Sequence, residues 1–104
     1  MDFTTTERGF DISQFKDIYG SKCSLQKSSL ATEDAIWFGV DDPTPQIMAS
    51  QAKQLGVKTD ETTGWVPYPI PEEVLLSTRM HLTQEMVKEL LPALIKFAET
   101  GDLK

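Results

Sequence analysis

Apolar and polar residues alternate in three stretches of the chain, and in a fourth stretch the apolar residues recur every three or four positions. Alternation is typical of a strand, because successive side chains point to opposite faces, whereas the longer spacing is typical of a helix with one apolar side. The alternating stretches are residues 10–18, 23–28 and 74–82, and the helical one is residues 83–100. The chain therefore combines several strands with a C-terminal helix.

Gly20 lies between the first two alternating stretches and supplies the positive φ that a tight turn needs, so residues 10–28 are predicted to form a β-hairpin. Residues 35–40 are apolar on both faces, as in a central strand that is covered on both sides. The predicted strand 74–82 has one apolar face, and its other face carries Arg79 and His81.

Thr83 is a good N-cap for the C-terminal helix, and Gly101 is a natural terminator after it. Pro92 lies inside the helix, where packing has to compensate for the lost hydrogen bond. Earlier in the chain, helical spacing predicts a short helix over residues 45–55. The proline-rich residues 64–71 are predicted to be extended and stiff, and unable to lie in the middle of a sheet.

These elements predict an α+β fold, with a small antiparallel sheet of about four strands and the C-terminal helix packed on one face. At 104 residues the chain has room for one core, so residues 10–104 are expected to form a single domain behind a flexible lead-in, residues 1–9. One helix leaves the second sheet face without cover. We therefore expect a homo-oligomer, a dimer or higher, that buries this face or the proline-rich arm.

The formal charge of −6, with ten Lys and Arg scattered singly, argues against nucleic acid as a direct partner. No apolar run approaches the roughly 20 residues of a membrane span, and the N-terminus has no signal-like pattern. The prediction is a cytoplasmic protein that does not bind membranes.

Metal and cofactor chemistry find little support in the sequence. Cys23 is the only cysteine and His81 the only histidine, and a zinc site needs about four ligands. The pair Asp41 and Asp42 precedes Pro43 and lacks the alternating carboxylates of a calcium loop, so it is interpreted as a turn. No metal and no cofactor are predicted.

A nucleophilic site would have to use Ser28, Ser29 or Cys23 with His81, the only imidazole. A carboxylate from Asp34, Asp41 or Asp42 would then orient the ring. No nucleophile elbow surrounds either serine, and no catalytic residues are predicted. The chain is expected not to be an enzyme, and a small hydrolase that uses Ser28 and His81 is kept as an alternative.

Two features favour binding instead. Trp65 and Tyr68 lie on the stiff proline-rich arm and can stack on a base, and Arg79 and His81 share one strand face and can meet a phosphate, with Ser77 beside them. Aromatics tucked under the sheet and solvated polar side chains are the alternative interpretations. The predicted ligand-binding residues are Trp65, Tyr68, Ser77, Arg79 and His81.

Four segments together resemble a family of small accessory proteins that are common in phage and prophage genomes. They are YGSKCSLQKSS at residues 19–29, WFGVD at 37–41, TRMHLT at 78–83 and ETG at 99–101. The resemblance implies a viral or mobile-element setting, with the protein in the host cytoplasm if a phage encodes it, and assigns no site residues. Short non-structural phage genes often encode inhibitors of host defence, which either block a host protein or sequester a signalling nucleotide, and sequestration is expected here. The alternative is direct inhibition of a host defence protein, in the manner of an anti-CRISPR protein or an acidic DNA mimic.

Overall fold

The computed structural model describes residues 1–104 and divides them into two compact units. The first unit consists of Met1–Asp41 and Thr78–Lys104, and the second of Asp42–Ser77. The sequence predicted one domain over residues 10–104. The structure differs because residues 47–66 enclose a small apolar core of their own.

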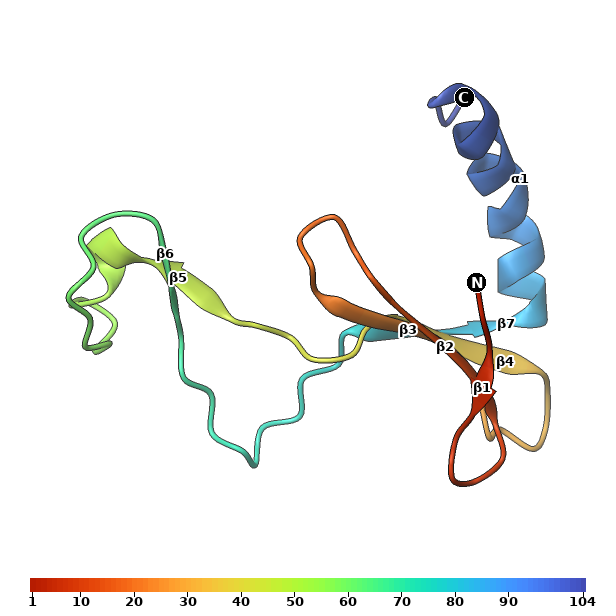
Figure 1. The fold of residues 1–104 in the computed structure, drawn as a ribbon, viewed down its shortest axis with the longest axis horizontal. Coiled ribbons are helices and arrows are strands. Elements are labelled where there is room, and N and C mark those ends of the chain that lie inside the picture. Colours follow the sequence, from red (N-terminus) through yellow and green to blue (C-terminus); the bar gives the residue numbers. More distant parts are fainter. The chain divides into compact units, whose positions relative to one another are not determined.

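The first unit contains a five-stranded antiparallel sheet in the order β1-β2-β3-β4-β7 (Figure 1). The predicted hairpin and the predicted central strand are both confirmed, because β2 pairs with β3 and β4 lies between β3 and β7. The strands are β1 (Thr4–Thr5), β2 (Asp11–Lys16), β3 (Lys22–Lys27), β4 (Ala35–Val40) and β7 (Arg79–Thr83).

The fifth strand, β1, comes from residues 1–9, which the sequence predicted as a lead-in outside the sheet. Thr4 pairs with Ile12 of β2, and the turn between the two strands is closed by a hydrogen bond that Phe10 N donates to the Thr6 hydroxyl. The side chains of this segment are mostly polar and exposed, so their pattern does not predict a strand.

The last strand is shorter than the alternation of residues 74–82 predicts. The register pairs Arg79 with Gly39, and β4 ends one residue further on, at Val40. Residues 74–77 therefore have no neighbouring strand to pair with, and Leu75 is 86% exposed. Apolar and polar residues alternate there in the sequence, but no partner strand forms hydrogen bonds with them.

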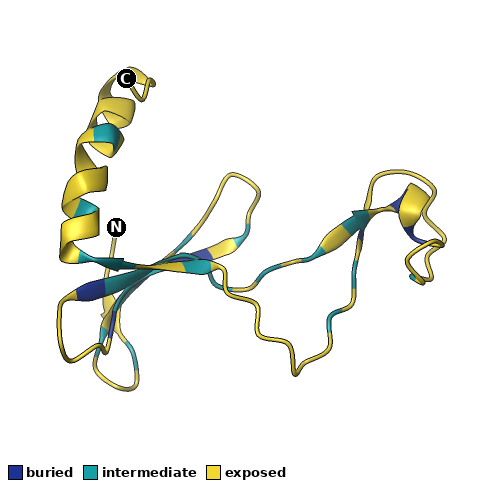
Figure 2. Ribbon diagram, turned by 180° about the vertical axis from the view of Figure 1, so that it is seen from behind, coloured by how far each residue is buried: buried dark blue, intermediate teal, exposed yellow.

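Helix α1 (Gln84–Thr100) begins and ends as predicted. The Thr83 hydroxyl accepts a hydrogen bond from Met86 N, and Gly101 closes the helix with a φ of 81°. The chain is thus an α+β protein, as expected. None of the helix residues is buried, and Figure 2 shows α1 mostly in the colour of exposed residues. The principal contact of α1 with the sheet is at β7, so the expected packing across a sheet face is limited to that end.

The second unit is built on a two-stranded antiparallel sheet of β5 (Gln46–Met48) and β6 (Trp65–Pro67). The short helix predicted over residues 45–55 is wrong. Residue Ile47 pairs with Val66 in this sheet, and only a 3-10 turn, η1 (Ala49–Gln51), follows. The proline-rich segment is extended as predicted, and its strand β6 has β5 as its one partner.

Neither helix combines the length and the apolar character that a membrane crossing requires.

Candidate functional site

Trp37 lies on one face of the five-stranded sheet, in strand β4 between β3 and the edge strand β7. Its neighbours along that face of β4 are Ala35 and Gly39, two of the smallest residues, and its partners across the ladder are Gln26 of β3 and His81 of β7. Small residues on both sides of an aromatic ring leave room for side chains of the outer strand to cross β4. Both long polar side chains of β7 use that room.

Arg79 crosses β4 at Gly39. Its Nη1 donates hydrogen bonds to Gln26 Oε1 at 2.8 Å and to Ser24 Oγ at 3.4 Å, both on β3. The guanidinium carbon lies 5.4 Å from the centroid of the Trp37 ring, within the range of a cation–π contact. A Cβ at Gly39 would meet the backbone of β7, at 2.9 Å from Thr78 O, so the close approach of the two strands depends on glycine.

The positive charge of Arg79 has no ion-pair partner. The two ion pairs of the chain are Lys27–Asp34 and Lys88–Glu85, and the groups that Arg79 contacts are a neutral amide and a neutral hydroxyl. Ser24 is fully buried, and its hydroxyl donates a hydrogen bond to the Asp41 carboxylate. The Asp41 carboxylate is therefore linked to Arg79 only through Ser24. A half-buried guanidinium in this position favours an anion as an additional partner.

His81 lies flat against Trp37. The two ring centroids are 3.9 Å apart and the planes differ by 4°. The His81 Nε2 atom shares a hydrogen bond of 2.8 Å with Ser28 Oγ, again across β4. Stacking and this hydrogen bond fix the imidazole, and the imidazole in turn fixes the indole.

A pocket of about 360 Å³ lies beside Trp37, between the sheet and the turn that joins β1 to β2. Its volume is within the roughly 300–1,000 Å³ that is common for small-molecule sites. Arg8 lies there with its guanidinium carbon 5.9 Å from the Phe10 ring centroid, so the pocket combines aromatic surface with an exposed cation. The lining residues are Thr6, Glu7, Arg8, Phe10, Gln26, Ser29 and Trp37.

The hydrogen bond between Ser28 and His81 has the length that a nucleophile and its base require. However, Ser28 is only 5% exposed, and its hydroxyl also accepts a hydrogen bond from Leu30 N, which closes the loop after β3. Ser28 is the only side-chain hydrogen-bond partner of His81, so the ring has no carboxylate to orient it. This geometry matches a structural serine better than an activated one.

Cys23 lies on the opposite face of β3 from Ser24 and Gln26 and does not meet His81. The thiol is buried, and burial raises its pKa, with the carboxylates of Asp17 and Asp41 adding to the effect. A raised pKa keeps the sulfur protonated and weakly nucleophilic. No three His, Cys, Asp or Glu side chains of the chain converge to form a metal site.

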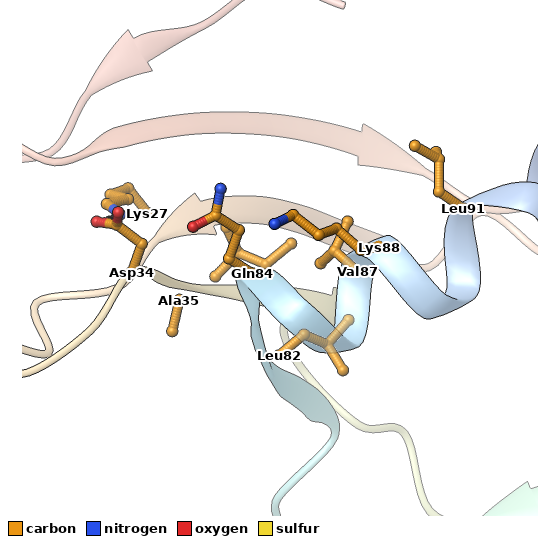
Figure 3. A pocket seen from close by; sticks show the side chains of 9 residues that line it. Lys27, Asp34, Ala35, Leu82, Gln84, Val87, Lys88 and Leu91 are labelled. Carbon is orange, nitrogen blue, oxygen red and sulfur yellow. Dashed lines mark hydrogen bonds and ion pairs between the residues drawn. The ribbon is translucent and has the colours of Figure 1, made fainter.

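On that opposite face, a groove of about 400 Å³ separates the start of α1 from the sheet (Figure 3). Its rim carries the Lys27–Asp34 ion pair of 2.7 Å, and the Lys27 ammonium lowers the pKa of the Asp34 carboxyl. The groove is lined by Lys27, Asp34, Ala35, Ile36, Leu82, Gln84, Val87, Lys88 and Leu91.

Of the residues predicted from the sequence, Arg79 and His81 lie together, on one face of β7 and over Trp37. Trp65, Tyr68 and Ser77 belong to the second unit, and their share in a site with Arg79 stays a prediction. Trp65 is 66% exposed on β6, and Tyr68 N donates a hydrogen bond to Pro45 O.

The residues that the sequence did not single out are Ser24, Gln26 and Trp37, together with Arg8 in the adjoining pocket. The signal for them was the tryptophan between Ala35 and Gly39 in a strand, since such spacing opens space on both sides of the ring on one face.

No protein-family model, no curated protein and no solved structure matches the chain.

Proposed function

We propose that this protein binds a small nucleotide without turning it over, and that it does so on the sheet face that carries Trp37. The observation that carries the proposal is the guanidinium of Arg79, which is held over an indole ring by two neutral hydrogen-bond acceptors and lacks a counter-charge. Only Nη1 is engaged, so the Nη2 and Nε hydrogens are available to a ligand.

A nucleotide has two chemical parts, an aromatic base and a charged phosphate, and this face offers a partner for each. Phe10 and Trp37 line the pocket and provide apolar surface for the base, with His81 already stacked on one face of the Trp37 ring. Arg79 and Arg8 provide charge-assisted hydrogen bonds for the phosphate. The amide of Gln26 and the hydroxyl of Ser29 also line the pocket and supply polar contacts for base edges or ribose.

The biological setting of the proposal rests on the resemblance to small phage proteins. In that setting, a protein that holds a host signalling nucleotide lowers its free concentration, and this antagonises a defence pathway that the nucleotide activates. Binding without turnover is sufficient for this effect, because each folded chain removes ligand by mass action.

The direct test is isothermal titration calorimetry with a panel of purine and pyrimidine nucleoside monophosphates and their 3′,5′-cyclic forms. Arg79→Met should weaken binding by about 1.5 to 3 kcal/mol, the range for losing a hydrogen bond to a charged group, which is about 10- to 150-fold in Kd. Lys58→Met is the matched control, because it removes one exposed positive charge from the second unit. Equal affinities for the wild type and Arg79→Met would contradict the proposal.

Recovery of the ligand separates binding from catalysis. After incubation and heat denaturation, a bound nucleotide should be released unchanged. Loss of the nucleotide that Ser28→Ala or His81→Ala abolishes would instead establish the hydrolase alternative, and capture of a host defence protein with no nucleotide affinity would establish the inhibitor alternative.

A further inference from the structure

One side of α1 is an exposed apolar stripe. Its large side chains are each between 39% and 55% exposed in the isolated chain, which amounts to about 500 Å² of apolar surface. A patch of that size is as large as the largest apolar patch of a typical monomer, roughly 300 to 600 Å², and such a patch is often functional. The stripe consists of Met86, Leu90, Leu91, Leu94, Ile95 and Phe97.

The surface of the whole chain points the same way. The chain exposes 8719 Å², whereas two separately folded units of these lengths would together expose about 7,000 Å². This surplus belongs to both units together. The stripe would contribute about 500 Å² from each of two copies, so their pairing buries about 1,000 Å² in all, which is about the minimum for a specific interface.

The spacing along α1 is that of a helix that packs against another helix. Val87, Leu90, Leu94 and Phe97 follow one another at intervals of three, four and three, the a and d positions of a coiled-coil seam. The charged residues of the helix lie on its other side, so the seam offers no charge for an oppositely charged partner to recognise. An equally apolar and equally spaced surface complements it, and a second copy of this chain supplies one.

We propose that α1 is a dimerisation helix and that two copies pair their α1 helices antiparallel about a two-fold axis. Antiparallel helices oppose their macrodipoles favourably, and a two-fold axis uses the same patch on both copies. With the axis level with Pro92, Val87 lies opposite the partner's Phe97 and Leu90 lies opposite the partner's Leu94, because an antiparallel seam pairs a positions with d positions. Val87 also lines the groove of about 400 Å³ (Figure 3), so the partner's Phe97 reaches that groove.

This interface lies on the side of the sheet opposite Arg79 and Trp37, because Ile36 of β4 and Leu82 of β7 line the groove, pair with each other and alternate with Trp37 and His81. From the Trp37 face of these two strands, only Ala35 at the start of β4 reaches the groove. The dimer and the nucleotide site are therefore separate proposals. Neither depends on the other, and each has a variant that leaves the other intact.

Sedimentation equilibrium of the full chain at about 50 micromolar, a concentration suited to interfaces of standard size, tests the proposal. The wild type should have twice the chain mass of 11.7 kDa, and Leu94→Asp should be a monomer, because it buries a charge in the seam. Leu94 is 44% exposed in the isolated chain, so this variant should still fold, which circular dichroism checks. Thr100→Asp adds the same charge outside the stripe and should stay a dimer.

A monomeric wild type would overturn the proposal. Hydrogen exchange of that monomer would then show what covers the stripe, because protection of α1 amides in the isolated chain would mean that the helix folds onto its own sheet. A dimer that persists in both Leu94→Asp and Phe97→Asp would also overturn it, since the interface would then lie elsewhere.

Discussion

The sheet face that carries Trp37, Arg79 and His81 depends on Gly39 for the path of the Arg79 side chain. Gly39 has a φ of 148°, and it stands where Arg79 crosses from β7 to β3. Any larger residue would push against the backbone of Thr78 and Arg79 and would adopt a conformation that side chains disfavour. A change here should therefore act on stability and on the ligand site together.

Gly39→Ala should lower the free energy of unfolding by about 1 to 3 kcal/mol, the cost of holding a non-glycine residue in a strained conformation. It should also weaken nucleotide binding, because β7 moves and takes Arg79 with it. Urea denaturation and calorimetry measure the two effects. Gly101→Ala is the control, since a Cβ at that helix end meets no atom within 4 Å, and it should leave binding unchanged. A neutral Gly39→Ala would mean that the β4–β7 approach is looser than the structure shows.

Asp34 illustrates how little an exposed ion pair contributes. The hydrogen bond and charge of Lys27 lower the pKa of Asp34 below its ordinary value of 3.8. A carboxyl with a depressed folded-state pKa adds stability above the ordinary value, and that stability is lost as the pH falls through the folded pKa. Because the Lys27 side chain is 41% exposed and the Asp34 side chain 75% exposed, water screens the pair, and its contribution should be small even at neutral pH.

Lys27→Met should return the pKa of Asp34 to about its ordinary value, as followed by NMR titration of the Asp34 carboxyl. The unfolding free energy at pH 7 should change only slightly, and below the range where Asp34 titrates the two proteins should be equally affected by acid. If the pKa of Asp34 were as low in Lys27→Met as in the wild type, a group other than Lys27 would have to depress it.

At the scale of residues, the sequence indicated which side of β7 carries Arg79 and His81, because alternation along a strand assigns side chains to faces. It did not indicate the role of Trp37. That residue lies in a run that is apolar on both faces, so its face is decided by the register with β3 and β7 rather than by its own segment. Arg8 was also missed, because the pocket beside it forms only when β1 pairs with β2.

At the scale of elements, the predictions succeeded where local signals agreed and failed where pairing decided. Helix α1 has an N-cap, a terminal glycine and a regular apolar stripe, and it forms as expected. The segment 45–55 has helical spacing as well, yet Ile47 pairs with Val66 in a strand. The residues of a short segment do not indicate a strand partner that lies beyond a long loop. The extent of β7 likewise depends on where β4 ends.

The thermal stability of α1 variants should depend on protein concentration. Leu94→Ala removes a side chain that is 44% exposed in a single chain but buried in the proposed dimer. Its Tm should fall clearly below that of the wild type at high concentration, and the difference should shrink on dilution as the wild type dissociates. Differential scanning calorimetry over a hundredfold concentration range measures this. A Tm difference that stays constant over that range would mean that Leu94 is buried within its own chain.

At the scale of the whole molecule, the small antiparallel sheet and C-terminal helix could be predicted, whereas the division into two units could not. Length alone favoured one core. The second unit arises because Ala49, Ala52 and Val66 bury one another between β5 and β6. No composition shift marks its boundaries at residues 42 and 77, and the strand predicted to begin at Val74 runs across the second of them.

The central claim is that the nucleotide lies against Trp37, and the two tryptophans of the chain allow a direct test. Trp37 and Trp65 each give one indole N–H signal in a ¹⁵N-correlated NMR spectrum, and single substitutions of each by Phe assign them. Titration with the tightest-binding nucleoside monophosphate should shift the Trp37 signal in the wild type and leave it unmoved at the same concentrations in Arg79→Met. A titration that moves only the Trp65 signal, or neither signal, would contradict the claim.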